Sequence, residues 1–286
     1  MNACLLEREI FSKPYFDRRG LIVACDGDEL IGFVHAGFGA DDQRATISTE
    51  YGATHALMVA SHVDRSLVSK MLLAESERYL KERGARFAFG GGVFPVDGFY
   101  LGLLGGSQLS GTLLSNFQML KVYRSAGYFE IVERRVLQSR LPNFRPIVNR
   151  DQLQVRRTYQ VDQQLDPPTD NWWDACTLGM IQRTLWCLNS RHNSVSEARV
   201  LTWDMEPIAS SWGVHAVGIM QLEDGQDGSL SKEETFLIGE ILRQERSRGA
   251  TLAEVHVAAT DVERLEMFAR LGFEEVDRSV TFRKEL

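Results

Sequence analysis

The chain carries the same unit twice, and this internal repeat restricts its fold more than any other sequence feature. Three matches carry it: Arg83-Gly84-Ala85 with Arg248-Gly249-Ala250 and Leu72 with Leu237, each 165 positions apart, and Ala126-Gly127-Tyr128 with Leu271-Gly272-Phe273, 145 positions apart. The equal offset of the first two matches keeps one helix in register without a gap. A repeat of this length indicates two duplicated domains and not a solenoid of short units.

Each copy is expected to alternate strands with amphipathic helices. In the first copy, residues 21–25 and 30–35 flank an Asp-Gly turn and predict a hairpin. A strand at 55–59, a helix at about 66–83 that stops at Gly84, a strand at 86–89, a helix at 116–125 and a closing strand at 130–137 follow. The second copy predicts strands at 154–161, 215–222, 252–258 and 276–283, with helices at 171–181, 232–248 and 261–270. The two offsets differ by a glycine-rich insertion in the first copy, which starts near Gly90 and ends near Gly111.

The length of 286 residues suits two domains, each large enough to bury its own core. Pro142 and Pro146 mark residues 141–150 as a linker, so the expected division is 1–140, 141–150 and 151–286. Only about 20 residues precede Leu21, and the first domain is therefore expected to lack its opening strand.

Charge and cysteine usage exclude several classes of protein. The 32 basic and 39 acidic residues leave a net charge of −7, without the basic excess of a nucleic-acid-binding protein. The four cysteines and six histidines are scattered, without metal-ligand spacing or a disulfide framework, so no metal is expected and the chain is predicted to be cytoplasmic. The longest uncharged run, 98–120, is too polar for a membrane span, and the N-terminus does not read as a signal peptide. The oligomeric state stays open.

One segment has a specific family pattern. Asn116, Val122, Tyr123, Gly127 and Tyr128 follow the spacing Asn-x-x-Ala-x-x-Leu-Tyr-x-x-x-Gly-Phe, with Met119 at the Ala position. This segment resembles that of the GNAT superfamily of acetyl-CoA-dependent N-acetyltransferases, and Met267 to Phe273 match its second part. The resemblance implies an α/β (α+β) fold of two tandem GNAT domains with mixed, mostly antiparallel sheets. It also implies acetyl-CoA as co-substrate and a small amine as acceptor.

The resemblance also implies where acetyl-CoA would bind. The backbone of three strand residues would face the pantetheine arm: Leu57, Met58 and Val59. The start of the following helix would face the pyrophosphate through free N–H groups and the positive end of its dipole. That segment comprises Arg65, Ser66, Leu67, Val68, Ser69 and Lys70.

Both copies depart from the family's glycine-rich pattern at this helix start. In the first copy, Leu67 and Ser69 replace the glycines, and Asp64 stands where a basic residue is usual. The second copy is acidic at the corresponding positions, with Asp224, Asp227, Glu233 and Glu234. Because like charge disfavours a pyrophosphate, any cofactor site is expected in the first copy.

The candidate catalytic residues each have a structural alternative. The resemblance makes Tyr123 the acid that protonates the leaving thiolate, whereas Phe268 in the second copy cannot donate a proton. Tyr123 could instead simply pack on the sheet, and Asn116 could contact the cofactor or cap its helix. His35 and His55 are candidate bases or structural strand histidines. The leading hypothesis is N-acetyl transfer in the first copy; the alternative is a non-catalytic GNAT-fold protein that binds a ligand or a protein partner.

Overall fold

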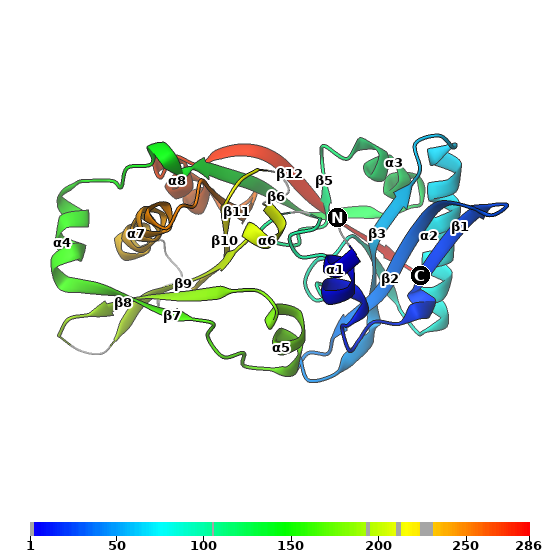
Figure 1. Ribbon diagram of the computed structural model, residues 1–286, viewed down its shortest axis with the longest axis horizontal. Coiled ribbons are helices and arrows are strands. Elements are labelled where there is room, and N and C mark those ends of the chain that lie inside the picture. The colour runs from blue at the N-terminus through cyan, green and yellow to red at the C-terminus, as the bar shows by residue number, and fades with distance from the viewer. Residues whose placement is uncertain (1–2, 105, 193–194, 210–212, 224–230) are drawn as a thin grey trace.

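The computed structural model describes residues 3–104, 106–192, 195–209, 213–223 and 231–286. Within these residues, twelve strands form one continuous mixed sheet in the order β1-β2-β3-β4-β12-β6-β11-β10-β9-β8-β7, with β5 paired beside β12. The two copies of the repeat form two lobes at opposite ends of this sheet, with α2 and α3 in one lobe and α7 and α8 in the other (Figure 1).

The first copy follows the predicted order of elements. Its members are α1 (Ala3–Leu6), the turns η1 (Glu7–Phe11) and η2 (Arg18–Gly20), β1 (Leu21–Asp26), β2 (Glu29–Ala40), β3 (Ile47–Val59), α2 (Arg65–Glu82), β4 (Phe87–Gly90), β5 (Thr112–Leu113), α3 (Phe117–Ser125) and β6 (Phe129–Arg140). Helix α2 packs against β2 and β3, because Leu72, Leu73 and Leu80 lie buried on one face of it.

The second copy adds one strand at its outer edge. Its members are η3 (Leu141–Asn143), α4 (Arg150–Thr158), β7 (Tyr159–Leu165), α5 (Trp172–Leu178), β8 (Arg183–Ser190), β9 (Ser196–Asp204), α6 (Glu206–Ala209), β10 (Ala216–Glu223), α7 (Lys232–Ser247), β11 (Leu252–Ala258), α8 (Val262–Arg270) and β12 (Glu274–Glu285). Strand β7 pairs with β8 and has no counterpart in the described part of the first copy.

The repeat predicted from the sequence holds in the strand register. The parallel pair β3–β4 ends at Thr54 opposite Gly90, and the parallel pair β10–β11 ends at Ile219 opposite Val255, so both partners are shifted by the same 165 positions. The N-caps of α3 and α8, Asn116 and Asp261, are 145 positions apart. Residues separated by these offsets therefore occupy equivalent positions in the two copies.

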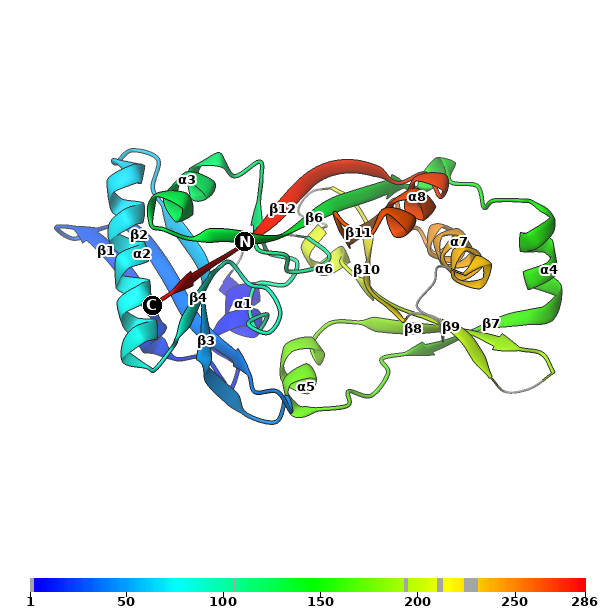
Figure 2. The ribbon, with the colours of Figure 1, turned by 180° about the vertical axis from the view of Figure 1, so that it is seen from behind.

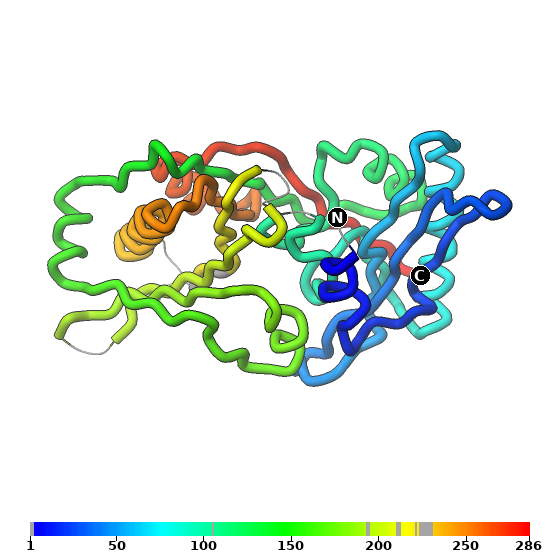
Figure 3. The backbone as a smooth tube through the Cα atoms, in the orientation of Figure 1, coloured from blue at the N-terminus to red at the C-terminus, as the bar shows by residue number. Residues whose placement is uncertain are grey.

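The two copies exchange their closing strands. Strand β6 of the first copy pairs with β11 of the second, and β12 of the second copy pairs with β4 of the first, at the equivalent positions Leu137 opposite Val255 and Phe282 opposite Gly90. Seen from behind, β12 crosses from one lobe to the other beside β6 (Figure 2), and the C-terminus lies in the lobe of the first copy (Figure 3). Phe282 is fully buried in the core of the first copy, so each core is completed by the other copy's last strand.

The region after residue 140 is more ordered than the prediction of a linker and a strand at 154–161. Residues 150–158 form α4, because Asn149 Oδ1 accepts a hydrogen bond from the backbone N–H of Gln152 and caps the helix, and Val155 packs into the second core. The strand begins only at Tyr159, so the strand prediction was wrong over 154–158. Within the described residues, no helix is long and apolar enough to cross a membrane.

Candidate functional site

The parallel strands β3 and β4 separate at the position where the resemblance places the pantetheine arm. Strand β4 pairs with β3 only as far as Thr54 opposite Gly90, whereas β3 continues to Val59. Along this continuation Leu57, Met58 and Val59 pair with β2 on the other edge, and Met58 is 39% exposed. A chain-like ligand can therefore reach the edge of β3 that β4 has left.

A cavity of about 360 Å³ lies where the next two helices meet. Its walls come from the first turns of α2 and from α3: Arg65, Ser66, Lys70, Phe117, Gln118, Lys121, Val122 and Ser125. Three of these side chains are cationic and none is acidic. Because the N-terminus of a helix also favours anions, this cavity is suited to a phosphate-bearing ligand.

The departures from the glycine-rich pattern have specific structural consequences. Asp64 caps α2, and its Oδ1 accepts a hydrogen bond from the backbone N–H of Leu67 at 3.0 Å, so this N–H is already used. The Leu67 side chain is 56% exposed, whereas Ser69 is buried on the sheet side of the helix. None of the three substituted side chains lines the cavity, so they leave it open. Arg65, which directly follows Asp64, and Lys70 both line it.

Tyr123 links α3 to the end of the β3–β4 pair. Its hydroxyl lies 3.5 Å from the carbonyl oxygen of Thr54, at the point where the two strands separate, and its ring packs on Tyr128 and Phe282. Burial raises the pKa of Tyr123 well above its usual range, so the hydroxyl is protonated at pH 7 and is a weaker acid than an exposed tyrosine. The residue is 2% exposed and packs in the core of the first copy, and its role as an acid stays a prediction.

His35 and His55 are brought together in a buried aromatic cluster. Their ring centroids are 5.7 Å apart, and the Phe99 ring meets both edge-on. His35 Nδ1 lies 3.1 Å from the Tyr100 hydroxyl, whereas both ring nitrogens of His55 are buried without a hydrogen-bond partner. Burial lowers the pKa of His35 to about 4, and burial together with His35 lowers the pKa of His55 well below its usual value, so both rings are neutral at pH 7.

Asn116 is the N-cap of α3. Its Oδ1 accepts a hydrogen bond from the backbone N–H of Met119 at 3.3 Å, and it does not line the cationic cavity. The capping contact accounts for an asparagine at this position. A contact between Asn116 and a cofactor stays a prediction.

In the second copy, the equivalent groove is occupied by the first copy's insertion. Gln108 Nε2 donates to the carbonyl oxygens of Ile219 (3.0 Å) and Met220 (2.7 Å), which are equivalent to Thr54 and His55 on β3. The backbone N–H of Ser107 donates to Glu254 Oε1 on β11 at 2.6 Å. This contact of the insertion with β10 and β11 has no signal in the sequence, because more than a hundred residues separate the partners.

The helix start of the second copy is also unsuited to a pyrophosphate. Glu234 stands at the position equivalent to Ser69, in the first turn of α7, and is 3% exposed. Burial and the nearby Asp261 raise its pKa to about 7. Asp224 and Asp227, expected to add negative charge here, lie outside the described residues.

A larger cavity of about 670 Å³ lies between the two lobes. Its walls come from the insertion, from Arg44 and Arg134 of the first copy, and from the α5, β8, β9 and β10 regions of the second. Leu109 belongs to this wall, and a Cβ placed on Gly92 would lie 3.3 Å from Leu109 and 3.6 Å from His55 Nδ1. One wall of this interlobe cleft therefore lies near the buried His55, which does not itself line the cavity.

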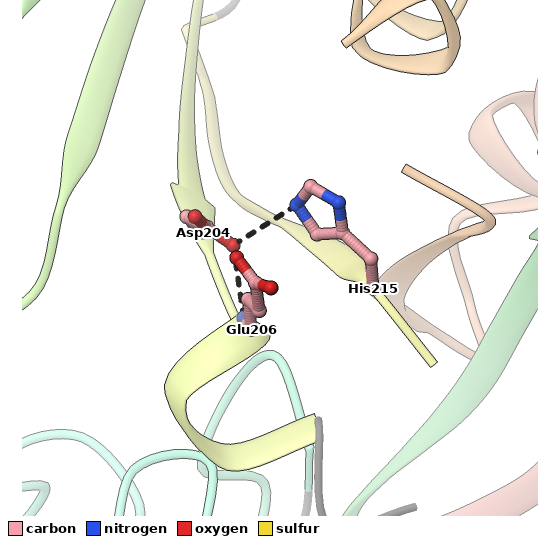
Figure 4. Close-up of side chains that lie close together, drawn as sticks. All are labelled: Asp204, Glu206 and His215. Atoms are coloured by element: carbon pink, nitrogen blue, oxygen red, sulfur yellow. Dashed lines mark hydrogen bonds and ion pairs between the residues drawn. The ribbon is translucent and has the colours of Figure 1, made fainter. Parts of the chain in front are cut away.

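Asp204, Glu206 and His215 gather at the start of α6, away from these two cavities (Figure 4). His215 Nε2 lies 3.4 Å from Asp204 Oδ1, and the same oxygen accepts the backbone N–H of Glu206 at 2.8 Å. The Asp204 carboxylate is thus already used as a helix cap and ion-pair partner.

Comparison with solved structures defines the class of fold. A tandem GNAT protein from the clavulanic acid biosynthesis pathway matches 94% of this chain and 85% of its own, at 11% identity and a TM-score of 0.63. A fungal multi-domain GH3 β-N-acetylglucosaminidase, described as having a GCN5-related glucosamine N-acetyltransferase region, matches 98% of this chain over 36% of its own chain, at 12% identity and a TM-score of 0.66. A GCN5-related N-acetyltransferase from Sphaerobacter thermophilus matches 93% of this chain and 79% of its own, at 12% identity and a TM-score of 0.58.

The chain therefore has the GNAT fold in a tandem arrangement, as the sequence resemblance predicted. Neither a family model nor a curated protein sequence matches it.

Proposed function

We propose that the protein is an acetyl-CoA-dependent N-acetyltransferase that acts on a small amine, with one active site in the first copy. The observation that carries this proposal is the cationic cavity at the start of α2, the helix that follows β3, which is lined by Arg65, Lys70 and Lys121 and by no acidic residue. In this arrangement Arg65, Lys70 and Lys121 bind the phosphates, and the β3 backbone from Leu57 to Val59 binds the pantetheine arm.

The chemistry is a direct acyl transfer. The neutral amine attacks the thioester carbonyl carbon, the N–C bond forms, the C–S bond breaks, and the Tyr123 hydroxyl protonates the departing thiolate. This role of Tyr123 is supported by its place in the segment from Asn116 to Tyr128 that resembles the family's, whereas burial raises the pKa of its hydroxyl and so makes it a weaker acid. His35 and His55 are neutral and are the candidate acceptors for the proton that the attacking amine loses. Their lowered pKa values make both rings weak bases.

The second copy supports the first as a structural partner. Its groove holds Gln108, its helix start holds Glu234, and Phe268 replaces the tyrosine. We therefore expect one acetyl-CoA per chain.

Calorimetric titration with acetyl-CoA tests the cofactor site. Lys70→Glu should weaken binding about tenfold or more, because the reversal removes an attractive charge and adds a repulsive one near the phosphates. Lys81→Glu makes the same charge change at the other end of α2 and should leave the affinity unchanged. Absence of binding at millimolar acetyl-CoA, or equal effects of the two reversals, would refute the site.

A second variant tests the chemistry separately from binding. Tyr123→Phe keeps the ring in the core and should retain acetyl-CoA affinity while it slows acetyl transfer to a responsive amine by about a hundredfold or more. If acetyl-CoA binds but no amine in a broad panel is acetylated, the non-catalytic alternative is favoured.

A further inference from the structure

We propose that the interlobe cleft binds the acceptor amine, and that this acceptor carries an anionic group, a carboxylate or a phosphate, at a distance from its amine. That the ligand is the acceptor amine rests on the proposed function, whereas the anion site rests only on the residues that line the cleft. Its volume of about 670 Å³ is in the usual range for a small-molecule site.

The cleft is rich in arginine in a chain whose net charge is −7. Four arginines line it, with three aspartates: Arg44, Arg134, Arg183, Arg199, Asp97, Asp170 and Asp174. Two of the three carboxylates are already engaged. Asp174 pairs with Arg44 at 2.7 Å, and Asp97 Oδ1 accepts the indole N–H of Trp173 at 3.1 Å.

Two of these arginines, Arg134 and Arg183, have buried N–H groups without a partner, and this indicates a binding site for an anion. In the described part of the chain neither makes an ion pair. Arg134 Nη1 is buried without a hydrogen-bond partner, and burial lowers the pKa of this guanidinium. Arg183 is 8% exposed; its Nη2 donates to the carbonyl oxygen of Pro167, whereas its Nε has no partner.

Buried guanidinium N–H groups without a partner are costly to the folded state. A carboxylate or phosphate in the cleft would accept these N–H groups in the fork geometry that arginine offers. One arginine comes from β6 of the first copy and the other from β8 of the second, so the site exists only because the two lobes meet.

One wall of the cleft lies near the proposed reaction centre. Leu109 in this wall and His55 both lie within 4 Å of a Cβ placed on Gly92, and His55 follows Thr54, whose carbonyl oxygen is 3.5 Å from the Tyr123 hydroxyl. An acceptor held by its anionic end at the arginines would thus extend its amine toward the same part of β3 that the cofactor approaches from the α2–α3 side.

Three small amines test this assignment by calorimetry on the full-length protein. The probes are 4-aminobutyrate, O-phosphoethanolamine and n-butylamine, which share an amine and differ in the other end. Either anionic probe should bind at least about tenfold more tightly than butylamine, and the better of the two identifies carboxylate or phosphate. Equal affinity for all three would overturn the assignment.

Charge-neutralising variants locate the binding. Arg134→Gln and Arg183→Gln should each remove the preference for the anionic probe, whereas Arg86→Gln, which changes an exposed arginine paired with Glu50, should keep it. Arg183→Lys retains the positive charge and should retain part of the preference. If Arg183→Gln does not fold, Arg134→Gln decides, because Arg134 is only partly buried, and an unchanged preference in this variant would overturn the assignment.

The acetyl-CoA titration separates this inference from the proposed function. Selective binding of an anionic probe without acetyl-CoA binding would support the anion site and refute the transferase. Acetyl-CoA binding with no selectivity among the three amines would refute the anion site and leave the transferase standing.

Discussion

Glu234 makes the stability of the protein depend on pH in an unusual direction. The carboxyl is 3% exposed at the start of α7, its Oε1 has no hydrogen-bond partner, and the nearest cation, Arg264 Nε, is 3.9 Å away at the limit of an ion pair. Burial, reinforced by Asp261, therefore outweighs the attraction and raises the pKa of Glu234 to about 7, from 4.5 in an unstructured chain.

The magnitude follows from this difference. Below pH 4.5 the carboxyl is protonated in both the folded and unfolded chains and has no effect on stability. As the pH rises from 4.5 to 7, the unfolded chain loses its proton first, so the free energy of unfolding falls. Above pH 7 the ionised group costs the folded state about 3 kcal/mol, at about 1.4 kcal/mol for each pKa unit.

Glu234→Gln removes this ionisation while it keeps the shape of the side chain. Urea unfolding of wild type and variant should give a stability gain for the variant that is larger at pH 8 than at pH 5 by about 2.5 kcal/mol, because part of the full effect is already present at pH 5. Glu233→Gln removes a charge from the same helical turn and controls for general electrostatics. Parallel pH profiles for wild type and Glu234→Gln would refute the reasoning, because all other titrating groups are common to both.

Two further predictions concern the exchange of segments between the copies. Phe282→Ala should destabilise the protein by about 3–5 kcal/mol in urea unfolding, because the ring is fully buried in the other copy's core; Phe129→Ala, at a 72% exposed site, should cost far less. Gln108→Ala should cost about 1–3 kcal/mol, since the Ile219 and Met220 carbonyl oxygens lose their partner, and calorimetry should show unchanged acetyl-CoA affinity.

The repeat and the order of elements could be predicted from the sequence because they depend on local patterns. The offsets of 165 and 145 positions came from glycines that end helices and from a leucine that packs a helix on its sheet. Each copy needs these residues to form its own helices and core. The cationic lining of the cavity between α2 and α3 was predicted only in part, and its binding of a cofactor stays a prediction. Arg65 and Lys70 lie on the expected helix, whereas Lys121 is brought to them by the packing of α3.

The exchange of closing strands could not be predicted in the same way. Strands β6 and β12 have similar lengths and equivalent positions in their copies, so either could complete either lobe by local criteria. The choice is made by pairing between distant residues, such as Phe282 with Gly90. Helix α4 was missed for another reason: Asn149 was taken as part of a linker, although it is a helix cap.

The insertion connects the two main findings about the site. Its residues Ser107 and Gln108 bind the strands β10 and β11 of the second copy, and Gln108 and Leu109 line the interlobe cleft. The contacts that fill the groove of the second copy therefore also position a wall of the cleft. If the two proposals hold, a single cofactor site and a defined acceptor cleft have the same structural cause, because a chain with two open grooves would lack this anchor between its lobes.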